Sequence, residues 1–184
     1  MIALFMADGF EEIEALTPVD YLRRKQLDVV TFGVNGKIVT GAHGIAVTAD
    51  REIGELSLEE LDGVILPGGM PGTLNLEKSP AVHAALEYCH KNGLMMAAIC
   101  AAPSILGHKG YLQGKRATCF PGFEKDCSGA VMTGDPAVKD GNVITGKSAG
   151  YADWFSTAIV SYLTDEKTAE NLLKDLQGCH ERHS

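Results

Sequence analysis

The sequence predicts an α/β fold built on a mainly parallel sheet with helices on both faces. Short apolar runs alternate with helix-forming segments along all 184 residues, which is typical of strands that are buried on both sides. The composition, 45% hydrophobic and 22% charged, is that of one ordinary globular domain. Because no repeat or linker interrupts this pattern, we expect a single domain over residues 1–176 and a polar tail over residues 177–184.

The first half of the chain supplies three strands of this sheet and its first helix. Each expected strand is a short apolar run that is followed by a charged residue, a glycine or a proline. In order, we expect a strand at Ile2–Ala7, a helix at Phe10–Lys25, a strand at Asp28–Val34, a hairpin or sheet edge at Ile38–Ala49, a short helical turn at Ser57–Leu61 and a strand at Gly63–Leu66.

The second half continues the alternation and adds a hairpin. Ser79 can cap a helix whose first position is Pro80, and Asp140-Gly141-Asn142 can form a tight turn between two short strands. In order, we expect a helix at Ser79–Lys91, a strand at Leu94–Ile99, a helix from Ala101 to about Lys109, a strand at Arg116–Phe120, hairpin strands at Ala137–Lys139 and Val143–Gly146, and helices at Tyr151–Leu163 and Glu166–Leu176.

The charge and the N-terminal residues exclude several classes of protein. The net charge is -8 and the acidic residues are spread along the chain, so we expect no nucleic-acid partner, which would need a basic face. The apolar N-terminus has no basic lead and meets Asp8, so neither a signal peptide nor a membrane span is expected. The five cysteines form no CxxC pair, and we expect them to be reduced in the cytoplasm rather than joined in a disulfide framework or zinc ribbon.

Cys100 is the most informative single residue. It directly follows the apolar run Leu94–Ile99 and precedes two alanines and Pro103, so it lies on a strand-to-helix turn between small residues. This is the thiol counterpart of a nucleophile elbow. The N-terminus of the following helix would favour the thiolate over the thiol. On spacing alone, a buried structural cysteine is an equally good interpretation.

Glu14 is the candidate partner of this thiol. It falls inside an apolar stripe on the first expected helix, whose members at helical spacing are Phe10, Ile13, Thr17 and Tyr21. A carboxylate that faces the core is costly unless it is paired or protonated, so a raised pKa and a hydrogen bond to Cys100 form one interpretation. A glutamate at the rim of the stripe that reaches water is the other, and the helix alone favours it. Asp8 and Glu11 have the spacing of a capping box.

A Gly-rich turn, Pro67-Gly68-Gly69, follows another buried strand. It lacks the Lys-Ser/Thr of a phosphate-binding P-loop and the spacing of a dinucleotide fingerprint, so no cofactor is expected. The backbone N–H groups of Gly69 and Ala101 could form an oxyanion hole, although an ordinary turn fits equally well. Because the carboxyl ends of parallel strands meet at one sheet edge, we expect this turn, Ala7-Asp8-Gly9 and Cys100 to converge on one pocket that Gly68 lines.

No histidine is marked by its position as a base for Cys100 or as a metal ligand, so we expect no metal. The histidines are His43, His83, His90, His108, His180 and His183. Cys119 and Phe120 follow an expected strand and could line the same pocket. Cys119 is a candidate resolving thiol, but a buried apolar filler is the better interpretation.

Four motifs in this order resemble those of the ThiJ/PfpI superfamily, in particular the branch that contains the Parkinson-disease-associated deglycase and bacterial YajL. The motifs are Gly9–Glu14 with Pro18-Val19-Asp20, Val64–Gly69, Ala97–Pro103 and Thr118–Pro121. The similarity extends from Met1 to about Leu163, and on it the chain is identified as a member of this family.

The resemblance implies a flavodoxin-like three-layer sandwich and usually a homodimer. It makes Cys100 the oxidation-prone nucleophile, Glu14 its protonated partner, and Gly69 and Ala101 the oxyanion donors. The chain departs from the family at two places. Phe120 stands where the human branch carries a histidine, so Glu14 would have to act as general acid and base alone. The run Lys147-Ser148-Ala149-Gly150 replaces Arg-Gly-Pro-Gly.

These residues favour a cofactor-independent cysteine enzyme of the glutathione-independent glyoxalase or protein deglycase type, with a role in oxidative and carbonyl stress. Its partner would be a small aldehyde or dicarbonyl, such as methylglyoxal or glyoxal, to which the Cys100 sulfur adds. The alternative is a non-enzymatic redox sensor or chaperone in which Cys100 is oxidised to a sulfinate. A PfpI-like cysteine protease ranks lower, because it would need a histidine close to the cysteine.

Overall fold

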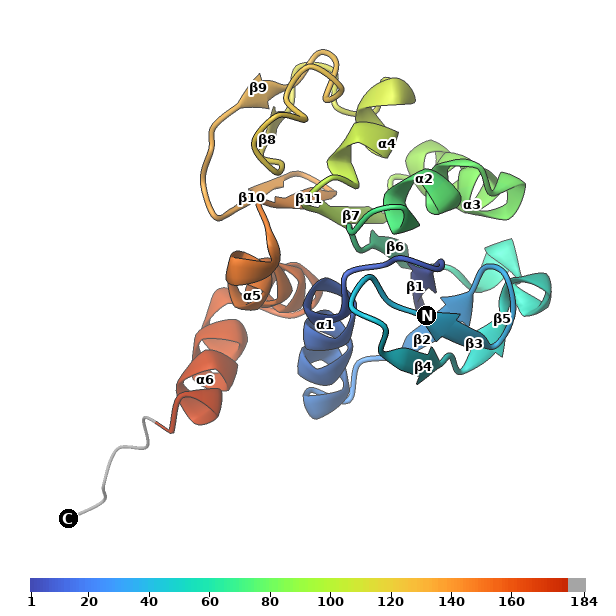
Figure 1. The fold of residues 1–184 in the computed structure, drawn as a ribbon. Coiled ribbons are helices and arrows are strands. Elements are labelled where there is room, and N and C mark those ends of the chain that lie inside the picture. The colour runs from blue at the N-terminus through green and yellow to red at the C-terminus, as the bar shows by residue number, and fades with distance from the viewer. Residues whose placement is uncertain (179–184) are drawn as a thin grey trace.

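Residues 1–178 are described by a computed structural model in which seven strands form one sheet, in the order β10-β11-β7-β6-β1-β2-β5 (Figure 1). Every pair of neighbours in this sheet is parallel except the edge hairpin of β10 and β11. The strands are β1 (Ile2–Met6), β2 (Val29–Gly33), β5 (Arg51–Glu52), β6 (Gly63–Leu66), β7 (Met95–Ile99), β10 (Ala137–Asp140) and β11 (Val143–Gly146). The order β2-β1-β6-β7-β11 is the flavodoxin-like one, which confirms the expected fold class.

Helices cover both faces of the sheet and give the sandwich its outer layers (Figure 1). Successive residues of β6 point to opposite faces: Val64 packs in the core cluster under α3 and α4, and Ile65 in the cluster under α1 and α5. Because both faces are buried, the central strands consist almost entirely of apolar residues. The helices are α1 (Glu12–Arg24), α2 (Gly72–Glu77), α3 (Pro80–Lys91), α4 (Pro103–His108), α5 (Ala152–Leu163) and α6 (Glu166–Leu176).

Several short elements differ from the expectations. The expected strand at Arg116–Phe120 is reduced to β8 (Arg116–Ala117), which pairs in parallel with an unexpected β9 (Val131–Met132). Helix α2 was also not expected. The remaining short elements are the paired strands β3 (Ile38–Thr40) and β4 (Ala46–Thr48), and the 3-10 turns η1 (Ile53–Glu55), η2 (Leu58–Glu60) and η3 (Ala149–Tyr151).

The first helix buries only part of the stripe that the sequence indicated: Phe10 and Tyr21 are buried, as expected. Ile13 is 54% exposed, whereas Ala15 and Leu22 are fully buried. The helix begins at Glu12, later than expected, and Glu11 caps it by accepting a hydrogen bond from the backbone N–H of Glu14. The capping box with Asp8 is therefore wrong, because Asp8 instead accepts from the backbone N–H of Thr40.

The domain limits stay a prediction. Of the expected tail, Gln177 and Gly178 are described, while 179–184, with Cys179, His180 and His183, lie outside the described residues. Within residues 1–178, no helix combines the length and the apolar character needed to cross a membrane.

The close packing of α2 against the chain that follows β1 predicts a specific sensitivity to added volume. A Cβ at Gly72 would lie 2.5 Å from the backbone nitrogen of Phe10, so Gly72→Ala should lower the free energy of unfolding by about 1–3 kcal/mol in urea denaturation. Gly54→Ala is the matched control, because a Cβ there meets nothing within 4 Å. Equal stability of the two variants would contradict this packing.

Candidate active site

Three segments meet at the carboxyl ends of β1, β6 and β7, next to the point where the strand order reverses between β1 and β6. The turn after β6 touches the chain that leads into α1, because the backbone N–H of Glu11 donates to the carbonyl of Gly68 at 2.9 Å. Gly69, at φ +89, could not carry a side chain here, since a Cβ would collide with the backbone at Glu11. The sequence correctly predicted that these segments meet.

Cys100 has the backbone conformation of a sharp strand-to-helix turn. Its φ of 65 lies in the left-handed region, which costs a residue other than glycine about 1–3 kcal/mol. Hydrogen bonds hold it on both sides: its N–H donates to the carbonyl of Gly146 at 2.9 Å, and its carbonyl accepts from the N–H of Phe120 at 2.8 Å. The surroundings therefore impose this conformation on the cysteine.

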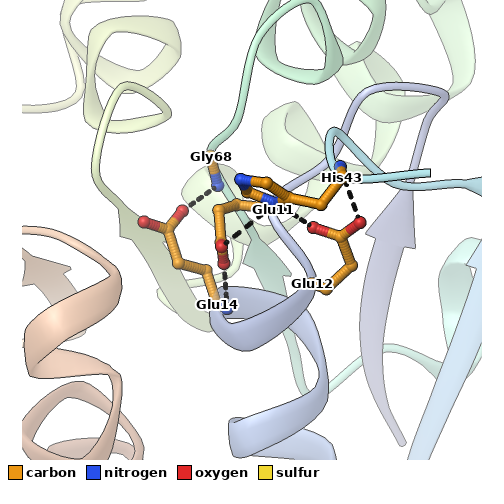
Figure 2. Close-up of polar contacts among 5 residues, drawn as sticks. All are labelled: Glu11, Glu12, Glu14, His43 and Gly68. Carbon is orange, nitrogen blue, oxygen red and sulfur yellow. Dashed lines mark hydrogen bonds and ion pairs between the residues drawn. The ribbon is translucent and has the colours of Figure 1, made fainter. Parts of the chain in front are cut away.

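Glu14 is completely buried, so the interpretation as a water-exposed rim residue is wrong. Its Oε2 accepts a hydrogen bond from the backbone N–H of Gly68 at 2.9 Å (Figure 2). Its Oε1 is buried as well. A Cβ at Gly68 would lie 2.6 Å from Glu14 Oε2 and 2.7 Å from the Cβ of Cys100. The carboxyl group and the cysteine therefore lie close together on either side of a glycine that has no room for a side chain.

The carboxyl group of Glu14 has a pKa near neutrality. Its pKa is raised to about 7, chiefly by burial and in smaller part by the charge of Glu11, while the contact with the Cys100 thiol opposes the rise. The backbone N–H groups of Gly68 and Ala149 favour the carboxylate and limit the rise. A carboxyl group in this range can both accept and donate a proton at neutral pH.

The thiol of Cys100 differs from the expectation. Burial, followed by the charge and the hydrogen bond of Glu14, raises its pKa to about 12, although the N–H groups of Ala101 and Gly69 favour the thiolate. The prediction that Cys100 is a thiolate is therefore wrong for the protein in which Glu14 is ionised. The helix N-terminus favours the thiolate, but it cannot offset the cost of burying a second negative charge beside a carboxylate. The pair loses one proton near neutrality and the second far above it.

The remaining predicted residues have different surroundings. The backbone N–H groups of Gly69 and Ala101 both lower the pKa of the Cys100 thiol. Phe120 contributes its backbone N–H and leaves its ring 43% exposed. Cys119 is buried, as an apolar filler would be, and contacts Cys127.

Two contributors to this site were not predicted from the sequence. Glu11 acts on Glu14 through its charge, and the N–H of Ala149 favours the carboxylate form. No side-chain pattern marks a backbone N–H group, so Ala149 carried no signal. Within residues 1–178, one group of side chains could hold a metal, namely Glu11, Glu12 and His43, whose donor atoms lie within 4.8 Å of one another.

Residues 1–162 match the model of the DJ-1/PfpI family. A protein named deglycase from Pyrococcus abyssi is 31% identical over 152 residues, which are 81% of this chain and 90% of that protein. The solved structure of oxidized DJ-1 from Toxoplasma gondii superposes with a TM-score of 0.91 at 30% identity, covering 96% of this chain and 97% of that one. The DJ-1 homolog B of Arabidopsis thaliana is 32% identical over 89% of this chain, which spans only 38% of that longer protein.

The contact between Glu14 and Cys100 predicts that Glu14→Gln makes the thiol more acidic. The carboxylate charge and hydrogen bond raise the thiol pKa, so their removal should bring it down from about 12. The measurement is the ultraviolet absorbance of the thiolate against pH, taken as the difference from Cys100→Ala. Glu170→Gln, at an exposed position, should leave the titration unchanged. A thiol pKa that rises in Glu14→Gln would contradict the assignment.

Proposed function

The chain belongs to the DJ-1/PfpI family, and from this premise we propose that it is a cofactor-independent cysteine enzyme that acts on reactive dicarbonyls or their adducts. The observation that carries the proposal is the close approach of the buried Glu14 and the partly exposed Cys100 on either side of Gly68. A relative that bears the name deglycase supports the same chemistry. Glyoxalase and deglycase reactions share their central steps, and we propose a role in oxidative and carbonyl stress for either.

In the first proposed step, the sulfur of Cys100 forms a bond to the aldehyde carbon of methylglyoxal. The thiol proton passes to the carboxylate of Glu14 as the sulfur attacks, so the resting enzyme does not need to hold Cys100 as a thiolate. The aldehyde oxygen develops negative charge, and the N–H groups of Gly69 and Ala101 stabilise it. Return of the proton from Glu14 to this oxygen gives a neutral hemithioacetal.

In the second proposed step, Glu14 moves a proton between the two carbons of the former dicarbonyl. It removes the proton from the carbon bonded to sulfur and delivers one to the neighbouring carbon, which converts the hemithioacetal into a lactoyl thioester. Water then breaks the carbon–sulfur bond and releases lactate and the free thiol. No oxidant is consumed, because one carbon is oxidised as the other is reduced. A glycated amine would enter the same sequence as its hemiaminal: the Cys100 sulfur replaces the nitrogen on the former aldehyde carbon, the amine leaves with a proton from Glu14, and the same hemithioacetal results.

A second candidate function is redox sensing. It is favoured by the relative from Toxoplasma gondii, whose structure is described as oxidized. Cys100 is the partly exposed member among the described free cysteines, since Cys89, Cys119 and Cys127 are buried. Peroxide would convert the Cys100 thiol to a sulfinate. The sensor hypothesis requires no dicarbonyl turnover, so the turnover measurement below separates the two candidates.

Two expectations stay predictions. We propose that the protein forms a homodimer, and the exposed apolar side chains of Ile13 and Leu16 on α1 are suited to such a contact. We also propose that it acts in the cytoplasm. The four described cysteines are free, as a reducing compartment would keep them.

The proposed reaction predicts methylglyoxal turnover that depends on both members of the pair. Cys100→Ala should reduce lactate formation to the level of buffer, because no nucleophile remains. Glu14→Gln should lower kcat/KM by about 10²–10⁴-fold, the usual contribution of a general acid–base group. Wild-type kcat/KM should rise as pH increases through about 7, since Glu14 must be ionised to accept the thiol proton.

Cys89→Ala is the matched control for this assay. Cys89 is another free cysteine whose pKa burial raises to about 12, but Glu14 does not act on it, so the variant should keep wild-type turnover. Wild-type protein that forms no lactate above buffer would overturn the enzyme proposal and leave the sensor. Equal activity of Cys100→Ala and wild type would exclude Cys100 as the nucleophile.

A further inference from the structure

Three side chains outside the Cys100–Glu14 pair converge at the start of α1 (Figure 2). Glu11 and Glu12 come from the N-terminus of the helix, and His43 comes from the loop between β3 and β4. Nδ1 of His43 lies 2.7 Å from Oε2 of Glu12 and 3.8 Å from Oε1 of Glu11. We propose that these three side chains bind a zinc ion. The proposal does not rest on the proposed dicarbonyl chemistry, although Glu11 also acts on Glu14 through its charge.

The backbone already orients both carboxylates toward the common point. Oε2 of Glu11 accepts from the N–H of Glu14 at 2.9 Å, and Oε1 of Glu12 accepts from the N–H of His43 at 2.8 Å. One oxygen of each carboxylate is therefore held, and the other faces the imidazole. Such supporting contacts are typical of metal sites, where they fix the ligands before the ion arrives. Gly41 makes this arrangement possible, because a Cβ there would collide with the Glu12 carboxylate.

The charge of the group favours a cation. Glu12 is only 5% exposed, and among the described residues the single group that forms an ion pair with Glu11 or Glu12 is His43. Two carboxylates therefore share one imidazole, which leaves a net negative charge at a partly exposed position that a cation can reach. The side chains open into a surface pocket of about 300 Å³ that Ile13 and Ile45 also line. This space admits an ion with a water molecule.

The donor set is suited to zinc. Zinc binds imidazole nitrogen and carboxylate oxygen at about 2.0–2.2 Å in tetrahedral geometry, which places neighbouring donors about 3.4 Å apart. The two separations from His43 Nδ1, 2.7 and 3.8 Å, lie on either side of that value. Small side-chain movements are therefore sufficient, and water completes the coordination. No metal was expected from the sequence, because no histidine is marked there as a ligand; Glu12 and His43 lie 31 residues apart and meet only in the fold.

Isothermal titration calorimetry with zinc chloride tests the site in the full-length chain. Cys100→Ala serves as the parent protein, because it removes a competing thiol. The parent should bind zinc at this site, and His43→Ala or Glu11→Gln in the parent should weaken that binding by about tenfold or more. His90→Ala is the matched control, since His90 is exposed and stacks on Tyr111 away from these carboxylates, and it should bind as the parent does.

Two further measurements keep the result interpretable. Glu11→Gln retains an oxygen that can cap α1, and circular dichroism with thermal unfolding should show both variants folded like the parent. The cobalt-loaded parent should show the visible bands of tetrahedral nitrogen and oxygen ligands without thiolate charge transfer. The proposal is wrong if the parent takes up no zinc or if His43→Ala binds it as tightly as the parent. A thiolate-to-cobalt band that persists in His43→Ala would likewise overturn it.

Discussion

The contact between the buried carboxyl group of Glu14 and the thiol of Cys100 determines the character of this site. A carboxylate without solvent is costly, and here the N–H of Gly68 offsets only part of that cost. Burial consequently raises the pKa of Glu14 to about 7, and the same carboxylate helps to raise the pKa of Cys100. The contact requires a residue without a side chain at position 68 and a left-handed conformation at Cys100. Both positions lie just after the carboxyl ends of central strands, Gly68 after β6 and Cys100 after β7.

The sequence predicted the central strands of the fold, because their apolar runs are a clear pattern. The central strands are short and buried on both faces, so their apolar runs were sufficient to place them. Helix α2 has only six residues, too few for a periodic pattern. Strands β8 and β9 have two residues each and pair across a long loop, so their pairing depends on tertiary contacts. The buried stripe of α1 was predicted only in part, because Ile13 is apolar but exposed.

The site could be predicted in position but not in electrostatics. The turn at Cys100 and the glycines after β6 follow from their places at strand ends, and the family resemblance supplied Glu14. The sequence also indicated a helix N-terminus, which favours a thiolate, but it could not weigh desolvation against it. The N–H of Ala149 acts on Glu14, whereas the family's run has a proline there, which has no N–H to donate. The meeting of Glu11, Glu12 and His43 depends on the loop between β3 and β4, a long-range contact.

The central claim is that Glu14 and Cys100 form one coupled pair, and carbon-13 NMR of the Glu14 side-chain carboxyl carbon tests it most directly. In the wild type this carbon should titrate near pH 7, well above the usual value of 4.5. In Cys100→Ala it should titrate higher still, because contact with the thiol lowers the pKa of the carboxyl group. Titration near 4.5 in the wild type, or an unchanged pKa in Cys100→Ala, would contradict the account.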